Sequence, residues 1–463
     1  MVGFHPARRA AGRVAALMGV LLLLAPSLAL GAGDFSASSP SLPGSTPTKK
    51  VFSSGTDVAI PDLSTVEGTI AVSGMGAYLW DVDVYTEIAH TWVADLDVRL
   101  VAPNGRTMAL TTNSGGSADN LFNGTWWDDQ ATETVTRMSF TNGVAEANLV
   151  PEGALGRMRG VNPNGTWKLR ISDENAGDPG TLGLWRIRIT TFSSEPFASG
   201  TQHGLVGPVP IVDQATTTSG IMVSGHTQSI FDVDLTTQIT HTWNGDLYIT
   251  LTSPEGTSVL VTAYRGGSND NVFANTRWGD QVNAPVTDHT FVNMVSPSPL
   301  NPEGAMSAFN GEDPNGTWTL SISDANAGDV GTLNGWSLSI QTGSVLTCDG
   351  KQATKVRFSS GTVTGTSGSD VIAVRNGTFT INGKGGDDTI CGAGGADTIS
   401  GGAGDDRIFG GKGGDTINGN DGADYIYGQA GSDSLAGGPG GSDLCVGGTG
   451  SDSLASNCET KRQ

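Results

Sequence analysis

The sequence has 463 residues, 68 of them glycine, and its formal net charge at pH 7 is −21. At roughly 150 residues per domain, this length predicts about three domains. The acidic balance argues against nucleic acid and anionic membranes as partners, because both require a basic patch on the protein.

Residues 1–32 are expected to form a signal peptide. Three arginines precede an apolar run from Val14 to Leu30, and small residues follow near Gly31. A basic start, an apolar stretch and a small-residue cleavage site are the parts of an export signal. A permanent membrane anchor is disfavoured because Gly, Pro and Ser interrupt a short run. We therefore expect a secreted, extracellular protein whose mature chain does not insert into membranes, and a Ser/Pro/Thr-rich linker over residues 33–50.

Residues 51–194 and 202–343 carry the same pattern twice. Equivalent residues keep a constant offset of 151 positions (241 minus 90 for His241 and His90), without insertion or deletion. A shared period of this length indicates a duplicated domain. The joint between the copies is expected near residues 195–204.

Each copy predicts an antiparallel β-sandwich. Runs such as residues 98–101, 167–171 and 185–189 alternate apolar and polar side chains, as half-buried strands do. The Asn-Gly pairs at residues 104–105 and 164–165 are typical of hairpin turns. Regular short strands joined by such turns favour a sandwich, and helical periodicity is lacking.

Two long motifs within each copy resemble a known domain. The first copy reads IAHTWVADLDVRLVAPNG and later NPNGTWKLRISDENAGDPGTLGLW, and the second reads ITHTWNGDLYITLTSPEG and DPNGTWTLSISDANAGDVGTLNGW. These motifs resemble the P domain, also called P/Homo B, which follows the subtilisin-like catalytic domain of proprotein convertases. The resemblance implies an eight-stranded jelly-roll sandwich that stabilises or regulates an adjoining protease.

We expect no enzyme in this chain. A protease of that class needs an Asp, a His and a Ser in their own strand and helix contexts, and neither a His-Gly-Thr nor a Gly-Thr-Ser-Met-Ala segment occurs. The most catalytic-looking groups are His90 near Asp95 and His241 near Asp246. No serine or cysteine stands at a nucleophile's spacing from them, so we interpret both histidines as structural.

The sandwiches carry two further candidate binding features. Trp126 and Trp127 offer a stacking platform for sugars, although a buried sandwich tryptophan is the preferred interpretation. Loop carboxylates form a secondary set of candidate calcium ligands, although Asp also favours turns by bonding its own backbone. This secondary set is Asp95, Asp119, Asp129, Asp173, Asp246, Asp270, Asp280 and Asp324.

Residues 359–458 repeat a nine-residue pattern, G-G-x-G-x-D-x-U-x, in which U is a large aliphatic residue. The glycines permit a tight turn that a Cβ would forbid, and the last three residues form a short strand whose middle side chain points inward. A disordered linker would have no reason to keep an aliphatic residue in register. Stacked turns are expected to bury a ladder of Ile372, Ile390, Ile399, Ile408, Ile417, Ile426, Leu435, Leu444 and Leu454.

The sixth position of the pattern is aspartate. Stacked turns bring like carboxylates together, which is repulsive unless a cation lies between them. Hard oxygen ligands in a flexible glycine turn suit calcium better than zinc or magnesium. Phe379 replaces the aspartate in one repeat, and an insertion near Gly441 displaces another. We predict several calcium ions on Asp370, Asp388, Asp397, Asp406, Asp415, Asp424, Asp433, Asp443 and Asp452.

This repeat resembles the hemolysin-type, or RTX, calcium-binding repeat, which forms a parallel β-roll. The resemblance implies two nonapeptides per turn, so that paired aspartates stand eighteen residues apart, as Asp388 and Asp406 do.

Four cysteines in an exported protein predict two disulfides, with three possible connectivities. Cys348 precedes the repeats, Cys391 and Cys445 are placed at ninth positions within them, and Cys458 follows them. Because the end turns of a stacked array fray first, we pair Cys348 with Cys391 and Cys445 with Cys458.

The sequence thus predicts an all-β, secreted, non-catalytic protein: two jelly-roll β-sandwiches followed by a parallel β-roll. Calcium is the expected cofactor, and it folds the roll by neutralising the aspartates. A protease, another protein or a glycan is the expected partner of the sandwiches. Two alternatives stay open: an accessory or regulatory component of a subtilisin-like protease system, and a calcium-dependent adhesin or glycan binder.

Overall fold

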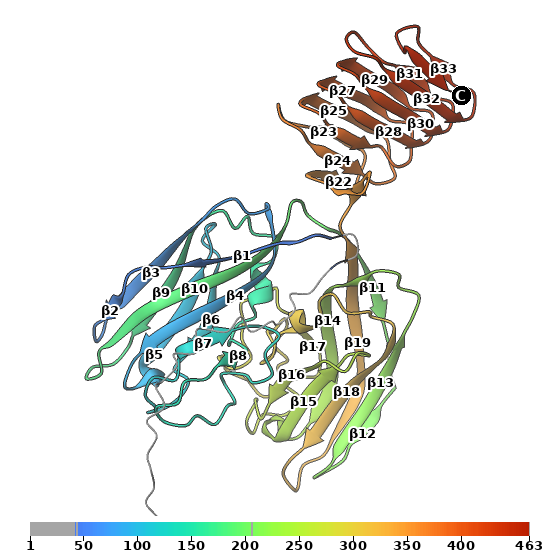
Figure 1. Cartoon of the computed structure of the whole chain (residues 1–463). Helices are drawn as coiled ribbons and strands as arrows, with labels where there is room; N and C mark the ends of the chain where they lie inside the picture. The colour runs from blue at the N-terminus through green and yellow to red at the C-terminus, as the bar shows by residue number, and fades with distance from the viewer. Residues whose placement is uncertain (1–41, 43–44, 205–206, 463) are drawn as a thin grey trace, which may run out of the picture. The chain divides into compact units, whose positions relative to one another are not determined.

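The computed structural model describes residue 42, residues 45–204 and residues 207–462 (Figure 1). Within these ranges the regular elements are β-strands and four short 3-10 helices, which confirms the all-β class. No helix in the described part has the length and apolar character needed to cross a membrane. The expected signal peptide lies outside the described residues.

The first domain consists of two facing sheets. One has the strand order β1-β10-β4-β7-β8, with β2 paired to β10, and the other has the order β3-β9-β5-β6. The strands are β1 (Thr48–Ser53), β2 (Val58–Ile60), β3 (Thr65–Val72), β4 (Tyr78–Ala89), β5 (Leu96–Val101), β6 (Thr107–Thr112), β7 (Asn123–Trp127), β8 (Asn148–Leu149), β9 (Gly165–Asp173) and β10 (Gly180–Phe192).

The second domain repeats this arrangement. Its sheets have the orders β11-β19-β14-β17, with β12 paired to β19, and β13-β18-β15-β16. The strands are β11 (Phe197–His203), β12 (Val209–Ile211), β13 (Thr216–Val223), β14 (Ser229–His241), β15 (Leu247–Thr252), β16 (Ser258–Ala263), β17 (Thr276–Trp278), β18 (Gly316–Asp324) and β19 (Gly331–Ser344). Matching 3-10 helices are η1 (Val93–Asp95), η2 (Leu155–Met158), η3 (Asn244–Asp246) and η4 (Met306–Phe309).

Alternating strands close a core between the two sheets of each domain. In β9 every second side chain from Trp167 onward is buried, and β18 repeats this pattern from Trp318. The indole N–H of Trp167 donates to the Pro163 carbonyl at 2.8 Å, so the buried ring leaves no polar group unsatisfied.

Some predicted boundaries and turns differ in the structure. Strand β1 begins at Thr48, inside the expected linker, and β11 begins at Phe197, inside the expected joint, because each pairs with the long last strand of its own domain. The Asn-Gly pair at residues 104–105 does join a hairpin, β5 to β6. The pair at residues 164–165 does not. Gly165 opens β9, whose partners are β3 and β5, and Asn164 instead bonds the backbone of Met75.

The C-terminal repeats form a roll of two parallel sheets, drawn from orange to red in Figure 1. One sheet has the order β22-β24-β26-β28-β30-β32-β34 and the other β23-β25-β27-β29-β31-β33. Successive turns pair residues eighteen apart, as in Ile390 with Ile408. A hairpin of β20 (Thr347–Cys348) and β21 (Lys351–Gln352) precedes the roll.

The bounds of the roll strands are β22 (Lys355–Arg357), β23 (Gly361–Thr364), β24 (Val371–Val374), β25 (Phe379–Gly385), β26 (Thr389–Cys391), β27 (Thr398–Ala403), β28 (Arg407–Lys412), β29 (Thr416–Asp421), β30 (Tyr425–Ala430), β31 (Ser434–Ala436), β32 (Leu444–Thr449), β33 (Ser453–Leu454) and β34 (Thr460–Arg462).

The buried ladder of the roll contains one residue that the sequence analysis placed wrongly. Cys445 pairs with Ile426 and is fully buried, whereas Leu444 pairs with Tyr425 and is half-buried. The inserted residue shifts the repeat by one position, so Cys445 stands at the inward eighth position rather than the ninth. Leu444 therefore does not belong to the ladder.

The roll carries a disulfide toward each end, Cys348–Cys391 and Cys445–Cys458. Their sequence separations are 43 and 13 residues. A longer closed loop restricts the unfolded chain more. We expect Cys348→Ser/Cys391→Ser to lower the free energy of unfolding of the roll by about 4 kcal/mol, and Cys445→Ser/Cys458→Ser by about 3 kcal/mol. Urea unfolding of the full chain measures both, and the reverse order would contradict the loop argument.

Candidate functional site: the aspartate rows of the roll

The sixth-position aspartates form two rows along the roll, one beside each sheet. One carboxylate oxygen of each inner aspartate accepts the backbone N–H of the residue eighteen positions earlier. Asp406 Oδ1, for example, lies 2.8 Å from the Asp388 nitrogen, and Asp415 Oδ1 lies 2.8 Å from the Asp397 nitrogen. The inserted residue is absorbed as a spacing of nineteen, with Asp443 Oδ1 at 2.9 Å from the Asp424 nitrogen. Each carboxylate therefore spans two turns.

Among the described residues, the second oxygen of these carboxylates has no hydrogen-bond partner. Oδ2 is buried and accepts no hydrogen bond in seven aspartates. A buried carboxylate oxygen without a hydrogen bond or counter-charge is costly, so such atoms are rare without a ligand. The seven residues are Asp388, Asp397, Asp406, Asp415, Asp424, Asp433 and Asp443.

A glycine and a carbonyl oxygen complete the surroundings of each unpartnered oxygen. A Cβ on Gly401, which opens the repeat of Asp406, would lie 2.2 Å from Asp406 Oδ2 and 2.8 Å from the carbonyl oxygen of Gly419. The same relation recurs at Gly410, where Asp415 Oδ2 and the Gly428 carbonyl would lie 2.5 and 3.0 Å away. The carboxylate and carbonyl oxygens thus converge on a space that only glycine leaves open.

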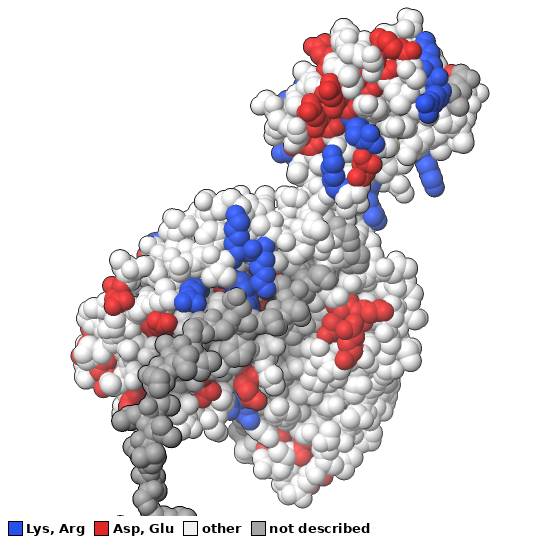
Figure 2. Space-filling model, viewed as in Figure 1, with Lys and Arg blue, Asp and Glu red and all other residues white. Residues whose placement is uncertain are grey.

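The charges in these rows repel one another. Burial first, and then neighbouring aspartates, raise the pKa of Asp388 and Asp424 to about 6 and that of Asp406 to about 7. Figure 2 shows acidic side chains gathered on the visible face of the roll. Carboxylate and carbonyl oxygens are the donors that calcium takes, and a cation between the turns would remove the repulsion. The residues present therefore fit calcium.

The two ends of the rows differ from the middle. Both oxygens of Asp370 accept hydrogen bonds, Oδ2 from Thr366 and Oδ1 from Thr354. Asp452 is half-buried and accepts the Asp433 N–H at 3.0 Å. Phe379, in place of an aspartate, still donates its N–H to Asp397. These ends lack the unpartnered buried oxygen of the inner turns.

One acidic residue outside the repeat continues a row. Glu459 Oε2 accepts the Asp443 N–H at 2.7 Å, as the next aspartate of the row would do. The sequence pattern missed Glu459 because the last turn lacks the glycine spacing and Glu459 follows Asp443 by 16 residues instead of 18.

The histidines of the sandwiches form buried pairs with aspartates, which accounts for them as structural residues. His90 Nε2 lies 3.2 Å from Asp173 Oδ2, and His241 Nε2 lies 3.1 Å from Asp324 Oδ2, with both pairs buried. Asp95, expected near His90, accepts from Asn175 instead. This arrangement orders the ends of β4 and β9, and likewise β14 and β18.

The secondary set of acidic residues makes separate hydrogen bonds in different parts of the sandwiches. Asp246 accepts from Asn326, as Asp95 does from Asn175, and the backbone N–H groups of Asp119 and Asp270 bond to asparagine side chains. Asp129 and Asp280 accept the N–H groups that open η2 and η4. In the described part of the chain, no three His, Cys, Asp or Glu side chains gather as a metal cluster. The roll sites above need no such cluster, since backbone carbonyls supply oxygens.

The tryptophan pair is not a surface platform. Trp126 is 5% exposed and Trp127 is 0% exposed. Trp127 donates its indole N–H to Thr86, and Arg188 stacks over Trp126 at 4.9 Å from the ring centroid. The glycan hypothesis required one of these rings at the surface, and the structure does not provide it.

Two curated proteins from Streptomyces contain segments similar to this chain. Residues of this chain are 36% identical over 140 residues to a transglutaminase-activating metalloprotease of Streptomyces mobaraensis, covering 30% of this chain and 14% of that protein. They are 34% identical over 144 residues to leupeptin-inactivating enzyme 1 of Streptomyces exfoliatus, covering 30% and 26%. The match thus spans about a quarter or less of each relative.

Among solved structures, the serine protease of Aeromonas sobria aligns with 32% of this chain and 28% of its own, at 18% identity and a TM-score of 0.22. Two family descriptions match three successive parts of the chain. Together with the sandwiches and the roll, they establish that the chain carries two proprotein convertase P-domains, at residues 79–189 and 230–340, followed by RTX calcium-binding nonapeptide repeats between residues 364 and 454.

Proposed function

We propose that the protein is a secreted, non-catalytic calcium-binding protein whose roll folds as it binds several calcium ions. The observation that carries this proposal is that seven aspartates in the two rows have a buried Oδ2 atom without a hydrogen bond. Each lies beside a backbone carbonyl in a space that glycine keeps open. RTX repeats are a calcium-binding family, which supports the choice of ion.

The aspartate oxygens determine how calcium binding affects the roll. Calcium supplies the positive charge that the aspartate rows lack. Each aspartate uses Oδ1 to fix the previous turn and keeps Oδ2 for the ion, so a ligand at one turn orders the next. Without the ion, the repulsion between stacked aspartates within each row opposes burial of the isoleucine ladder, and the glycine-rich chain gains entropy by unfolding.

A calcium titration of the full chain tests this proposal. Hydrogen exchange with mass-spectrometric detection reports the roll and the sandwiches separately. We expect protection of the roll peptides to rise cooperatively with calcium, at roughly 0.1–1 mM as in other extracellular modules. Peptides of the two P-domains are expected to change little.

Asp406→Asn is the matching variant, because it keeps the Oδ1 acceptor and removes the charge at Oδ2. We expect its calcium midpoint to rise about tenfold, the effect of losing a charged contact of about 1.5 kcal/mol. Asp421→Asn, which removes the same charge at an exposed position, is the control and should leave the midpoint nearly unchanged. Equal shifts in both variants, or full protection in excess chelator, would refute the proposal.

Secretion and the lack of catalysis belong to the same proposal. RTX repeats are typical of extracellular proteins and the chain holds two disulfides, which persist in oxidising compartments. Neither matched family is catalytic. The P-domain is a protein-interaction unit here, and its similarity to segments of proteases favours one second function, that of an accessory component for a protease. Peptide hydrolysis by the pure protein would contradict the non-catalytic assignment.

A further inference from the structure

The two P-domains contact each other through equivalent residues. The helices η2 and η4, which correspond under the offset of 151 (306 minus 155), pack together. Gln130 donates to the Ser307 carbonyl at 3.5 Å, and Gln281 donates to the Gly156 carbonyl at 3.4 Å. Gln281 is the counterpart of Gln130, and Ser307 is the counterpart of Gly156. One hydrogen bond is therefore the image of the other.

A second pair of contacts obeys the same rule. Thr136 donates to Glu303 Oε2 at 3.2 Å, and Thr287 donates to Glu152 Oε1 at 2.9 Å. These residues also correspond by an offset of 151. In an isologous interface, residue i of one unit contacts residue j of the other while j contacts i. Both pairs meet this condition within a single chain.

Residues on the axis of such an interface must meet their own counterparts, and they do. The rings of Trp80 and Phe231 lie 5.5 Å apart. Ala154 and Ala305 share one small apolar cluster. A Cβ on Gly156 would lie 2.7 Å from the Cβ of its counterpart Ser307. The two domains are thus related by an approximate twofold axis through these positions.

A single serine occupies the centre of the axis. Ser307 Oγ donates to Asp129 Oδ2 at 2.5 Å, across the interface. A Cβ on Gly156 would lie 2.7 Å from Ser307 Oγ and 3.0 Å from Asp280 Oδ2, so the centre has room for only one side chain. Burial, and then Asp280, raise the pKa of Asp129 to about 8, because its carboxyl group is buried close to a second buried carboxyl group.

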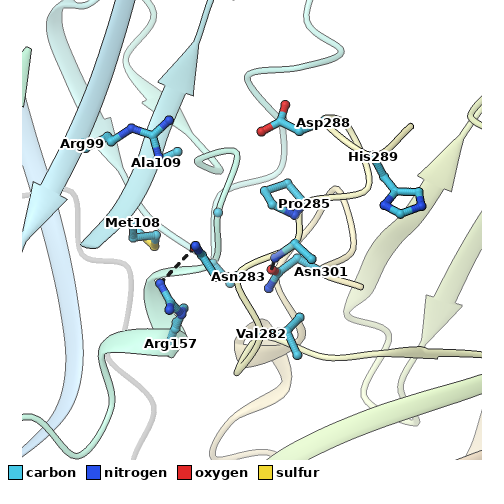
Figure 3. Close-up of a pocket in the computed structure, with 13 residues that line it drawn as sticks. Arg99, Met108, Ala109, Arg157, Val282, Asn283, Pro285, Asp288, His289 and Asn301 are labelled. Atoms are coloured by element: carbon cyan, nitrogen blue, oxygen red, sulfur yellow. Dashed lines mark hydrogen bonds between the residues drawn. The ribbon is translucent and has the colours of Figure 1, made fainter. Parts of the chain in front are cut away.

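Some contacts between the two domains have no symmetric counterpart. The guanidinium of Arg159 lies over both Trp80 and Phe231, at 5.2 and 5.0 Å from their centroids, and its counterpart is Asn310. Arg157 donates a hydrogen bond to Asn283 Oδ1 at 3.0 Å, and both residues line a cavity of about 290 Å³. Figure 3 shows this bond as a dashed line between the two domains' side chains. The counterpart of Arg157, Ala308, makes no such bond. These additions strengthen an arrangement that the symmetric contacts define.

We propose that this face is a self-recognition surface of the P-domain, and that the partner it fits is a second P-domain of the same kind. The tandem is then a covalently joined dimer in which each domain occupies the binding face of the other. An outside partner must therefore use a different face. This inference is independent of calcium binding by the roll.

Cleavage of the chain between the two P-domains tests whether they stay associated without the covalent link. A site-specific protease sequence is inserted between Glu195 and Pro196 of the full chain, and the cut protein is diluted before size-exclusion chromatography. We expect the halves to elute together at micromolar concentration. Separation of the halves at that concentration would overturn the proposal.

Exchange of the central residues tests the symmetry itself. In the cut protein, Gly156→Ser should crowd Ser307, and Ser307→Gly should remove the bond to Asp129, so each change weakens association about tenfold or more. The double variant Gly156→Ser/Ser307→Gly moves the serine to the other side of the axis, where its Oγ reaches Asp280. We expect association within about threefold of the unsubstituted protein.

An asymmetric contact would give a different result. If the double variant is as weak as the product of the two single effects, no twofold relation exists and the proposal is wrong. Gln130→Ala and Gln281→Ala provide a milder check, since equivalent contacts should weaken association by similar factors. Circular dichroism of each uncut variant confirms that both domains remain folded.

Discussion

Alanine in place of Gly431 is expected to abolish the folded roll. Gly431 has φ of +146°, and a Cβ there would lie 1.6 Å from the carbonyl oxygen of Gly413 on the neighbouring turn. No side-chain rotation relieves this overlap, because both atoms belong to the backbone or are fixed to it. The two turns would have to separate, which breaks the parallel ladder and both aspartate rows at that level.

Gly368→Ala provides the matched control. Gly368 also lies in a turn of the roll, but apart from Gly368 itself and its two chain neighbours, no atom of the described residues lies within 4 Å of its ideal Cβ position. Hydrogen exchange of the full chain in calcium should show complete loss of protection in roll peptides for Gly431→Ala and near-normal protection for Gly368→Ala. Equal protection in the two variants would mean that the turns do not stack as described.

Methionine in place of Arg188 is expected to destabilise the first P-domain by about 3–5 kcal/mol, the usual cost of leaving a buried charge without its partner. Arg188 Nε lies 2.6 Å from Asp83 Oδ2, and Arg188 Nη2 lies 3.6 Å from Asp128 Oδ2. Arg188 and Asp83 are both buried, and burial already raises the pKa of Asp83. Differential scanning calorimetry of the full chain measures the loss. Arg186→Met, on the same strand but half-buried, should cost much less.

The second domain supplies a rescue for this variant. There Asp234, the counterpart of Asp83, is paired at 2.7 Å with Arg277, which stands where the first domain has Trp126. Ser339 and Gly279 replace Arg188 and Asp128. Trp126→Arg/Asp128→Gly/Arg188→Ser copies that arrangement and should recover more than half of the lost stability. A triple variant no more stable than Arg188→Met would show that the arginine position of the second domain cannot neutralise Asp83 in the first.

The amino-acid sequence by itself determined the parts of this protein that repeat. The nine-residue period fixes the turn and the inward aliphatic residue because both depend on neighbours within one nonapeptide. The offset of 151 identifies two copies of one domain, and the P-domain and RTX assignments follow from motifs that are continuous in the chain. Both families, the all-β class and the alternating strands such as β9 were therefore predictable.

Prediction from local sequence failed where one inserted residue shifts the strand register or where one distant contact changes the role of a motif. Cys445, rather than Leu444, fills the ladder because the insertion near Gly441 moves the strand by one position. The Asn-Gly pair before Trp167 was interpreted as a hairpin, yet Asn164 bonds the distant Met75. In both places the sequence motif was genuine, but its consequence depended on a neighbour on another strand.

Only the tertiary structure decided which groups are left without partners and which faces meet. The end residue Asp370 has no unpartnered oxygen, because Thr366 of its own repeat bonds Oδ2 and Thr354 of the preceding segment bonds Oδ1, whereas the inner carboxylates keep Oδ2 without a hydrogen bond. Trp126 is buried and is contacted by Arg188, sixty-two positions later (188 minus 126), and by Tyr85. The contact between Ser307 and Asp129 joins residues from the two separate domains. Such features arise from packing between distant segments, and no local pattern encodes packing of that kind.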